Sequence, residues 1–421
     1  MKQTEYRIHR DLFFKQMDEN SFALFSSGKA PFKLKDQIYP FAVNRNFYYL
    51  TGLMRENFIL LLLRDKLSFY TFLFIEEPSE YATKWLGSRM TKEEASEVSG
   101  IKVESIMYLR EFDEFIAKRV LIDTRSAVAT MPNKLYLDLS KEHVMKKPFG
   151  LISFQTIVDI YPELQILDAS TIIDNLRRVK SAYEIDEIKK AIHFTNEGIQ
   201  ALMSNVKPGM NERQLEALFE YTIKVEGSSG TSFNTISASG KNATVLHYED
   251  NNCVIKNNTL VLTDLGALSN NYAADITRTY PANGAFTNRQ KQFYQLVLDV
   301  NKTIIDMIKP GIYVSDLNKK ATSLLAEGMK RLGKITNSQD IIKYYYHSVS
   351  HYLGLDVHDV GTYNLPLEPG VVLTVEPGIY VEDEAIGIRI EDDILVTETG
   401  HINLSKEIIK EIKDIELFMK K

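Results

Sequence analysis

Two aspartates lie in neighbouring β-rich segments, where they could hold a cation. Asp264 ends the segment LVLTD, and Asp275 begins DITRTY. The loop between the segments is rich in turn-forming residues, namely Gly266, Ser269, Asn270 and Asn271. We therefore expect a hairpin or adjacent strands. A carboxylate buried among apolar residues needs a cationic partner. An ordinary alternative is that Asp264 caps a turn and Asp275 pairs with Arg278.

Two glutamates occupy similar positions further along the chain. Glu376 follows the apolar segment VVLTV and precedes a Pro-Gly turn. In IGIRIEDDILV, strand alternation predicts Arg389 and Glu391 on one face and two isoleucines on the other. Four acids on buried strands repel one another, and Arg389 alone cannot neutralise them. Divalent cations are therefore the expected counter-charge.

Histidines complete this candidate site. Four of the eight in the chain are His247, His347, His351 and His358, and the last three lie within YHSVSHYLGLDVHD. Their spacing fits one helical face, although Gly354 makes a loop or a strand an equally good prediction. Clustered histidines are commonly surface residues. Here they follow one acid pair and precede another, which favours a metal site.

The expected metals follow from the ligand types. One histidine with four carboxylates is an oxygen-rich set, unlike the Cys/His tetrahedra of structural zinc. We expect two divalent ions, preferably Mn²⁺, with Co²⁺, Fe²⁺ or Zn²⁺ as alternatives. Two metals about 3.5–4 Å apart can share a hydroxide nucleophile and polarise a carbonyl, which predicts hydrolysis of an amide, ester or phosphoester. The sequence lacks a Walker-type phosphate loop, which favours a peptide substrate.

The elements that position these residues are expected in two domains, 1–170 and 171–421. The first mixes β-rich runs with helical stretches such as 92–98 and is typical of an α/β domain. Its predicted strands are 21–25, 58–63, 67–75 and 119–122. In the second, Ser181 and Glu184 have capping-box spacing and predict the start of a helix. Its buried stripe is predicted to be Ile185, Ile188, Ile192, Thr195, Ile199 and Leu202.

The second domain also contains a short internal repeat. Helical patterns end in Lys-Pro-Gly at 207–209 and again at 309–311, and Leu215 and Leu317 follow at equal distances. β-rich segments come after each repeat. An internal duplication would explain this match and would predict a pseudo-twofold domain with its site at the centre.

Composition narrows the class of protein. The chain has 421 residues, 44% of them hydrophobic and 25% charged, as in globular proteins. Its net charge of −6 argues against nucleic-acid or anionic-membrane binding. The polar start, MKQTEYRIHR, lacks the apolar core of a secretory signal, so we expect a cytoplasmic protein. The single cysteine, Cys253, is expected to be buried filler rather than a nucleophile.

Taken together, the motifs resemble metallopeptidases of the creatinase/prolidase/methionine-aminopeptidase group, and most closely aminopeptidase P. The matching segments are DQIYPFAVNRNFYYLTGL, SASGKNATVLHY, LVLTDLGALSNNYAADITRTYP, SHYLGLDVHDVG, LEPGVVLTVEPGIY and IGIRIEDDILVTETG. They span nearly the whole chain in order. The resemblance implies an α+β protein with a pseudo-symmetric pita-bread domain at the C-terminal end. It further implies a smaller N-terminal α/β domain of the creatinase type and assembly into a homodimer or homotetramer.

The resemblance also implies roles for individual residues. Asp264 would bind one metal, His351 and Glu376 the other, and Asp275 and Glu391 would bridge the two. The implied catalytic residues are Glu376 as general base, His247 and His358. The residues implied to line the leaving-group pocket or orient ligands are His347, Tyr380 and Arg389.

The implied activity is removal of the first residue from peptides whose second residue is proline, by a hydroxide held between two metals. A prolidase, which cleaves dipeptides with the same ligands, is the alternative enzyme. Methionine aminopeptidase is disfavoured because it lacks the N-terminal domain. A metal-free binding scaffold is the alternative outside enzymes. Two departures from the family pattern are Ser348, where glycine is common, and the short loop TYNLP, which lacks arginine.

Overall fold

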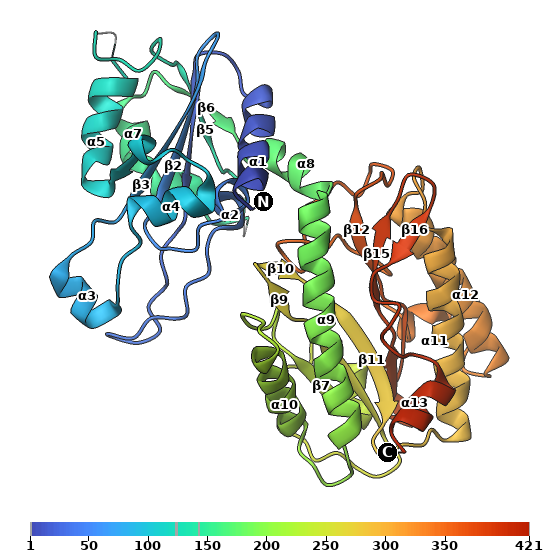
Figure 1. The fold of residues 1–421 in the computed structure, drawn as a ribbon. Coiled ribbons are helices and arrows are strands. Elements are labelled where there is room, and N and C mark those ends of the chain that lie inside the picture. Colours follow the sequence, from blue (N-terminus) through green and yellow to red (C-terminus); the bar gives the residue numbers. More distant parts are fainter. Residues whose placement is uncertain (1, 123–124, 142–143, 421) are drawn as a thin grey trace. The chain divides into compact units, whose positions relative to one another are not determined.

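The computed structural model of the chain describes residues 2–122, 125–141 and 144–420 (Figure 1). The chain divides into two compact units, one extending to Arg177 and the other beginning at Arg178. This division falls near the end of helix α8 (Ser170–Arg178), whereas the sequence places the domain boundary at the start of that helix.

The first unit is built on a six-stranded mixed sheet in the order β4-β3-β2-β1-β5-β6. Its antiparallel pairs are β1·β2 and β2·β3, and its parallel pairs are β3·β4, β1·β5 and β5·β6. The strands are β1 (Ser21–Ser26), β2 (Ile59–Arg64), β3 (Phe69–Ile75), β4 (Ile106–Tyr108), β5 (Lys134–Leu137) and β6 (Gln165–Asp168). The first three confirm predicted strands. Leucines 60–63 of β2 are almost completely buried, as expected for a central strand covered on both faces.

Helices accompany this sheet in the order of the chain. They are α1 (Lys2–Gln16), α2 (Arg45–Thr51), α3 (Glu80–Leu86), α4 (Lys92–Ser99), α5 (Phe112–Phe115), α6 (Phe149–Ser153), α7 (Gln155–Ile160) and α8. The predicted helix at 92–98 is confirmed by α4, whose capping box joins Thr91 and Glu94.

The strand predicted at 119–122 is wrong. Arg119 lies in a π-helical turn, Ile116–Val120, that continues α5. Phe112, Ile116 and Val120 recur every four residues, and all three are buried in the core of this unit. The helical spacing therefore buries more apolar surface than an extended segment would.

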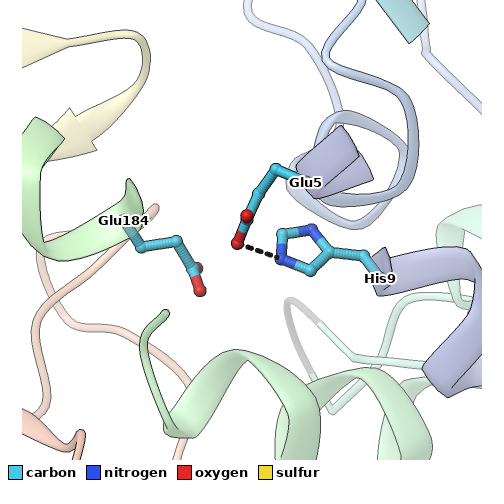
Figure 2. A group of neighbouring side chains, drawn as sticks. All are labelled: Glu5, His9 and Glu184. Carbon is cyan, nitrogen blue, oxygen red and sulfur yellow. Dashed lines mark ion pairs between the residues drawn. The ribbon is translucent and has the colours of Figure 1, made fainter. Parts of the chain in front are cut away.

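Helix α1 is tied to α2 through His9. Figure 2 shows the ion pair between Glu5 and His9, one helical turn apart, with 3.3 Å between Oε1 and Nε2. The His9 ring stacks on Tyr49, and its Nδ1 lies 2.7 Å from the Tyr49 carbonyl oxygen. The figure also labels Glu184, which belongs to the second unit and caps helix α9 there.

The second unit contains two successive sets of helices followed by strands. The first set comprises α9 (Ala182–Asn205), α10 (Glu212–Val225), β7 (Ile236–Ser239), β8 (Leu260–Leu265), β9 (Leu268–Ser269), β10 (Tyr272–Ala273) and β11 (Ile276–Pro281). The second comprises α11 (Asn288–Met307), α12 (Val314–Arg331), β12 (Val372–Val375), β13 (Gly378–Val381), β14 (Ile386–Arg389), β15 (Asp392–Val396), β16 (His401–Asn403) and α13 (Ile412–Phe418). Each set thus repeats the order of a long helix, a second helix and strands.

The long helices of this unit are amphipathic. Helix α9 begins with the predicted capping box between Ser181 and Glu184, and its predicted stripe is buried except for the half-buried Ile185. Lysines and other polar residues occupy its outer face. No helix in the described ranges is long and apolar enough to cross a membrane.

The repeated Lys-Pro-Gly triplets adopt the same backbone geometry. Gly209 and Gly311 both have positive φ, at 95° and 89°, in the turns that follow α9 and α11. Leu215 and Leu317, at matching positions in α10 and α12, are both completely buried. The sequence repeat therefore corresponds to a repeated helix–turn–helix structure, with glycine where a side chain would be strained.

Candidate active site

The second unit contains a cavity of about 530 Å³. Nine of the ten predicted site residues line it, namely Asp264, Asp275, His351, Glu376, Glu391, His247, His347, His358 and Arg389. The tenth, Tyr380, contacts two of them through its hydroxyl group. Residues spread over more than a hundred positions of the chain therefore meet in one place.

Paired strands bring the acids to this cavity. The predicted hairpin is confirmed, because β8 and β11 pair antiparallel with Asp264 opposite Thr277. Glu376 directly follows β12. The segment predicted as one strand at 386–396 is divided into β14 and β15, and Glu391 lies at the break between them. The predicted alternation holds, since Ile388 and its neighbouring isoleucine are buried while Arg389 and Glu391 reach the cavity.

Three potential ligands lie closest together. Asp275, His351 and Glu391 each place one ligand atom within 4.8 Å of the others. His351 Nε2 lies 3.3 Å from Asp275 Oδ2 and 3.6 Å from Glu376 Oε1. Its Nδ1 lies 3.0 Å from the carbonyl oxygen of Tyr352 and donates to it. That bond leaves the Nε2 lone pair facing the acids, which is the tautomer a metal requires.

The histidine-rich segment is a loop, not a helix. Between residues 347 and 361 the backbone forms bends, and Tyr352 makes an isolated bridge to Leu373 of β12. The bridge places His351 beside the strand that leads to Glu376. The His358 ring approaches the His351 ring edge-on, with 4.4 Å between their centroids.

A buried arginine connects one acid to the tyrosine. Arg389 donates to Asp264 Oδ2 at 2.6 Å, to the Tyr380 hydroxyl at 2.8 Å and to Thr277 Oγ1 at 3.0 Å. The Tyr380 hydroxyl in turn lies 2.9 Å from His347 Nε2. Burial lowers the pKa of His347 to about 4, so this imidazole is neutral at pH 7 and accepts the tyrosine proton.

The charge of the site calls for cations. Burial, followed by the repulsion of neighbouring carboxylates, raises the pKa of Asp275 and Glu376 well above the usual range. The same causes raise the pKa of Glu391 to about 7. Asp264 Oδ1 is buried and accepts no hydrogen bond from the described residues. Arg389 is one positive charge among these acids, so the donor set fits divalent metal ions.

The alternative partner for Asp275 does not occur. Arg278 is fully buried and donates to Asp392 Oδ1 at 2.9 Å, and further bonds run to backbone carbonyls. Lys410 also pairs with Asp392. Asp275 consequently keeps its charge for the cavity.

Sequence reasoning missed two residues beside the ligands. Thr277 donates to Glu391 Oε2 at 2.6 Å while accepting from Arg389. Asp393 is fully buried, and its Oδ2 accepts from the Asp275 backbone N–H at 3.2 Å. Strand alternation in DITRTY, which puts Thr277 on the face of Asp275, was an available signal for the threonine.

The prediction for Cys253 is wrong in one respect. Its side chain is exposed and lies 3.7 Å from the Tyr248 hydroxyl, outside the cavity lining. The residue follows a polar loop, so its flanking valine does not draw it into the core.

Comparisons with known proteins place the chain in a family. The model of metallopeptidase family M24 matches residues 186–398, and that of the aminopeptidase P N-terminal domain matches residues 6–127. The Xaa-Pro aminopeptidase of Escherichia coli (strain K12) is 31% identical, over 99% of this chain and 97% of that protein. A structure described as an aminopeptidase P from Bacillus anthracis has a TM-score of 0.95 and 44% identity, covering 100% of this chain and 99% of the other.

A structure of E. coli aminopeptidase P with the inhibitor Pro-Leu has a TM-score of 0.89 and 29% identity, covering 100% of this chain and 98% of the other. The predicted fold, an N-terminal α/β domain followed by a pita-bread domain, is confirmed by these matches. The chain belongs to metallopeptidase family M24 and, within it, to the aminopeptidase P family.

Proposed function

We propose that this protein is a metal-dependent aminopeptidase that hydrolyses the first peptide bond of peptides with proline in second position. The observation that carries the proposal is the convergence of Asp275, His351 and Glu391 within 4.8 Å, in a cavity that two further acids also line. Relatives that match over almost the full length are named Xaa-Pro aminopeptidases, which supports this specificity over that of a prolidase.

We assign two divalent ions, preferably Mn²⁺, to the five acidic and histidine ligands. Asp264 would hold one ion, His351 and Glu376 the other, and Asp275 and Glu391 would lie between them. The unpartnered Asp264 oxygen and the raised pKa values of three acids support this assignment. When bound, such ions supply Lewis acidity and make water a nucleophile near neutral pH.

Glu376 is placed to move a proton. Its carboxylate borders the cavity at 16% exposure, with His347 and His351 on either side at 3.6 Å. In that position it can take the proton of the attacking water and return it to the proline nitrogen as the bond breaks. Other acids of the site are buried more deeply or are bonded to neighbouring side chains.

Two histidines face the substrate space. His247 and His358 both line the cavity and are exposed, and they come from different loops. Burial, together with the neighbouring His351 and His247, lowers the pKa of His358. Imidazole N–H groups at these positions would donate to the scissile carbonyl as negative charge develops on its oxygen.

The chain of Arg389, Tyr380 and His347 orients the leaving-group side. Since Arg389 donates to Tyr380, the tyrosine hydroxyl proton points to His347. The His347 Nδ1 lies 2.7 Å from the Ser348 carbonyl oxygen and donates to it. Both ring nitrogens are thereby occupied, so the ring is held as a fixed wall where the proline would lie.

The wider assignments remain part of the same proposal. Residues 1–170 form the N-terminal domain and residues 171–421 the catalytic domain. The resemblance to the family supports a homodimer or homotetramer, and the sequence composition supports a cytoplasmic location.

The test is to follow alanine release from Ala-Pro-Ala and from Ala-Pro by Mn²⁺-loaded protein, with a chelator control. Chelator-sensitive release from the tripeptide, with little from the dipeptide, is the expected result. A preference for the dipeptide would make the protein a prolidase. Protein that binds no added Mn²⁺ and releases no alanine would revive the metal-free scaffold.

A further inference from the structure

A buried acid outside the cavity organises the loop that carries His247. Glu212 is the first residue of α10, is completely buried and does not line the cavity. Its carboxylate accepts hydrogen bonds from Ser239 N (2.7 Å), Ser239 Oγ (2.7 Å), Asn242 Nδ2 (3.0 Å), Tyr248 Oη (2.9 Å) and Cys253 N (3.0 Å). One side chain therefore gathers donors from both ends and the middle of a single segment.

That segment, residues 239–253, is the His247 loop. It leaves the sheet at the end of β7, makes the 3₁₀ turn Gly240–Thr244 and then presents His247 to the cavity. Tyr248, the residue next to His247, donates directly to Glu212. Backbone movement at Tyr248 would displace His247 as well, so Glu212 limits where this imidazole can lie.

Asn251 gives the loop a second anchor. It is completely buried, with a positive φ of 45°, and its amide donates to the Thr235 carbonyl oxygen at 2.8 Å and to Glu216 at 3.2 Å. Its Oδ1 accepts from the Ser237 backbone N–H at 2.8 Å. The loop is thus held against α10 and β7 at a position beyond His247.

The internal repeat shows which anchor is special to this half. The spacing of the Lys-Pro-Gly triplets makes Asn318 of α12 the counterpart of Glu216. Asn318 Oδ1 accepts from the Val349 N–H at 2.8 Å and so holds the loop that carries His351. The counterpart of Glu212 is Val314, which is buried and apolar. An acid at this position therefore belongs to the His247 side alone and is not required by the helix–turn–helix scaffold.

We propose that Glu212 is a positioning residue that holds His247 at the substrate carbonyl by fixing the His247 loop. The inference rests on the proposed peptidase function for the role of His247. Glu212 touches neither the cavity nor the metal ligands in the described structure, so its effect must pass through Tyr248 and the loop backbone.

The two carboxylate oxygens make a conservative test possible. Oε1 accepts from the Ser239 N–H, and Oε2 accepts from the Cys253 N–H. In Glu212→Gln one of these oxygens becomes an NH₂ group, which cannot accept. Either orientation of the amide therefore opposes a backbone N–H with another donor, although the side chain keeps its size.

The experiment compares Glu212→Gln with Glu220→Gln, a more exposed position two turns further along α10. We expect Glu212→Gln to lower kcat/KM for Ala-Pro-Ala by about 10–100-fold, mainly in kcat, with bound Mn²⁺ unchanged. In a His247→Ala background the same change should have almost no further effect on kcat/KM. An equal loss in that background, or a loss of Mn²⁺, would show that Glu212 does not act through His247. Glu220→Gln should match the parent.

A second measurement does not depend on activity. Hydrogen exchange of the Mn²⁺-loaded protein should quicken in residues 239–253 of Glu212→Gln and stay unchanged in β8, β11 and β12. Unchanged exchange in the loop would overturn the positioning role, even if the parent protein released no alanine and the peptidase proposal failed. Should Glu212→Gln fail to fold, Tyr248→Phe tests the same link, with a smaller loss of kcat expected and unchanged kcat counting against it.

Discussion

His351 Nε2 lies 3.3 Å from Asp275 Oδ2, although the two residues come from different halves of the repeated domain. The hairpin of β8 and β11 supplies the aspartate, and the loop bridged to β12 supplies the histidine. The candidate metal site is therefore formed only when both halves are folded and paired. Each prediction below depends on this convergence.

Replacing His351 should remove metal before it alters the fold. The His351→Ala protein should bind Mn²⁺ more than about 100-fold more weakly than the parent, because the loss of even an outer-shell partner costs 10–100-fold. Titration calorimetry with Mn²⁺ measures this change directly. His193→Ala, which alters an exposed histidine of α9, is the matched control and should bind Mn²⁺ as the parent does. Equal affinity in both variants would remove His351 from the ligand set.

Replacing Glu376 should abolish hydrolysis while leaving the fold intact. We expect Glu376→Ala to retain less than about 1% of the parent kcat, since general acid–base catalysis contributes about 10²–10⁴-fold and a ligand is lost as well. Circular dichroism should be unchanged. Glu382→Ala, at an exposed glutamate paired with Lys241, serves as the control. Activity of Glu376→Ala within a few-fold of the parent would contradict the assignment of the base.

The stabilisation provided by Mn²⁺ should increase with pH. In the metal-free fold the pKa of Glu391 is about 7, above its ordinary value of 4.5, and the pKa values of Asp275 and Glu376 are also raised. The folded state then binds protons more tightly than the unfolded chain. The contribution of these acids to stability is complete below about pH 4.5 and is lost as the pH rises through 7.

Metal ions replace those protons, so the loaded protein should escape this loss. Thermal unfolding with chelator or with Mn²⁺, between about pH 5 and 8, measures the difference at each pH. Taking the difference matters because the lowered pKa of His347 favours folding as the pH rises in both states. The difference should become smaller and flatter in Glu391→Gln. A difference that shrinks with rising pH in the parent would contradict the raised pKa values.

The buried arginine behind the site should matter greatly for stability. Arg278→Met leaves Asp392 with only Lys410, and it unties the backbone carbonyls of Ile408 and Ile409. We expect the free energy of unfolding to fall by about 3–5 kcal/mol, as for other broken buried ion pairs. Urea denaturation at fixed Mn²⁺ concentration provides the measurement.

The control for that prediction is a partly exposed arginine. Arg289 pairs with Glu384 at 2.7 Å, and its side chain is 36% exposed. Arg289→Met should cost about 1 kcal/mol or less, because water screens such pairs. A loss as large as that of Arg278→Met would show that burial is not what separates the two arginines.

Several features of this protein were predictable from the sequence because they depend on near neighbours in the chain. Strand alternation placed Arg389 and Glu391 on one face, as observed. Capping-box spacing located the start of α9, and the Lys-Pro-Gly triplets marked the ends of two long helices. Periodicity and turn chemistry act over a few residues, so a sequence displays them directly.

Local signals failed where more than one conformation buries the same residues. The run at 119–122 reads as a strand, yet the helical spacing of Phe112, Ile116 and Val120 in one core decides for a π-helical turn. The histidine-rich segment fits a helical face by its spacing but is a loop, because Tyr352 pairs with β12. Tertiary packing chose between alternatives that the local pattern left open.

The sequence by itself determined the types of ligand, the alternation that aims them and the repeat that frames them. Only the tertiary structure decided the partners. It gave Arg278 to Asp392 and not to Asp275, placed Arg389 between Asp264 and Tyr380, and joined Glu212 to the His247 loop. The physical reason is that a charge or a hydrogen bond acts over a few ångströms in space, and chain folding alone brings residues from distant strands and helices within that range.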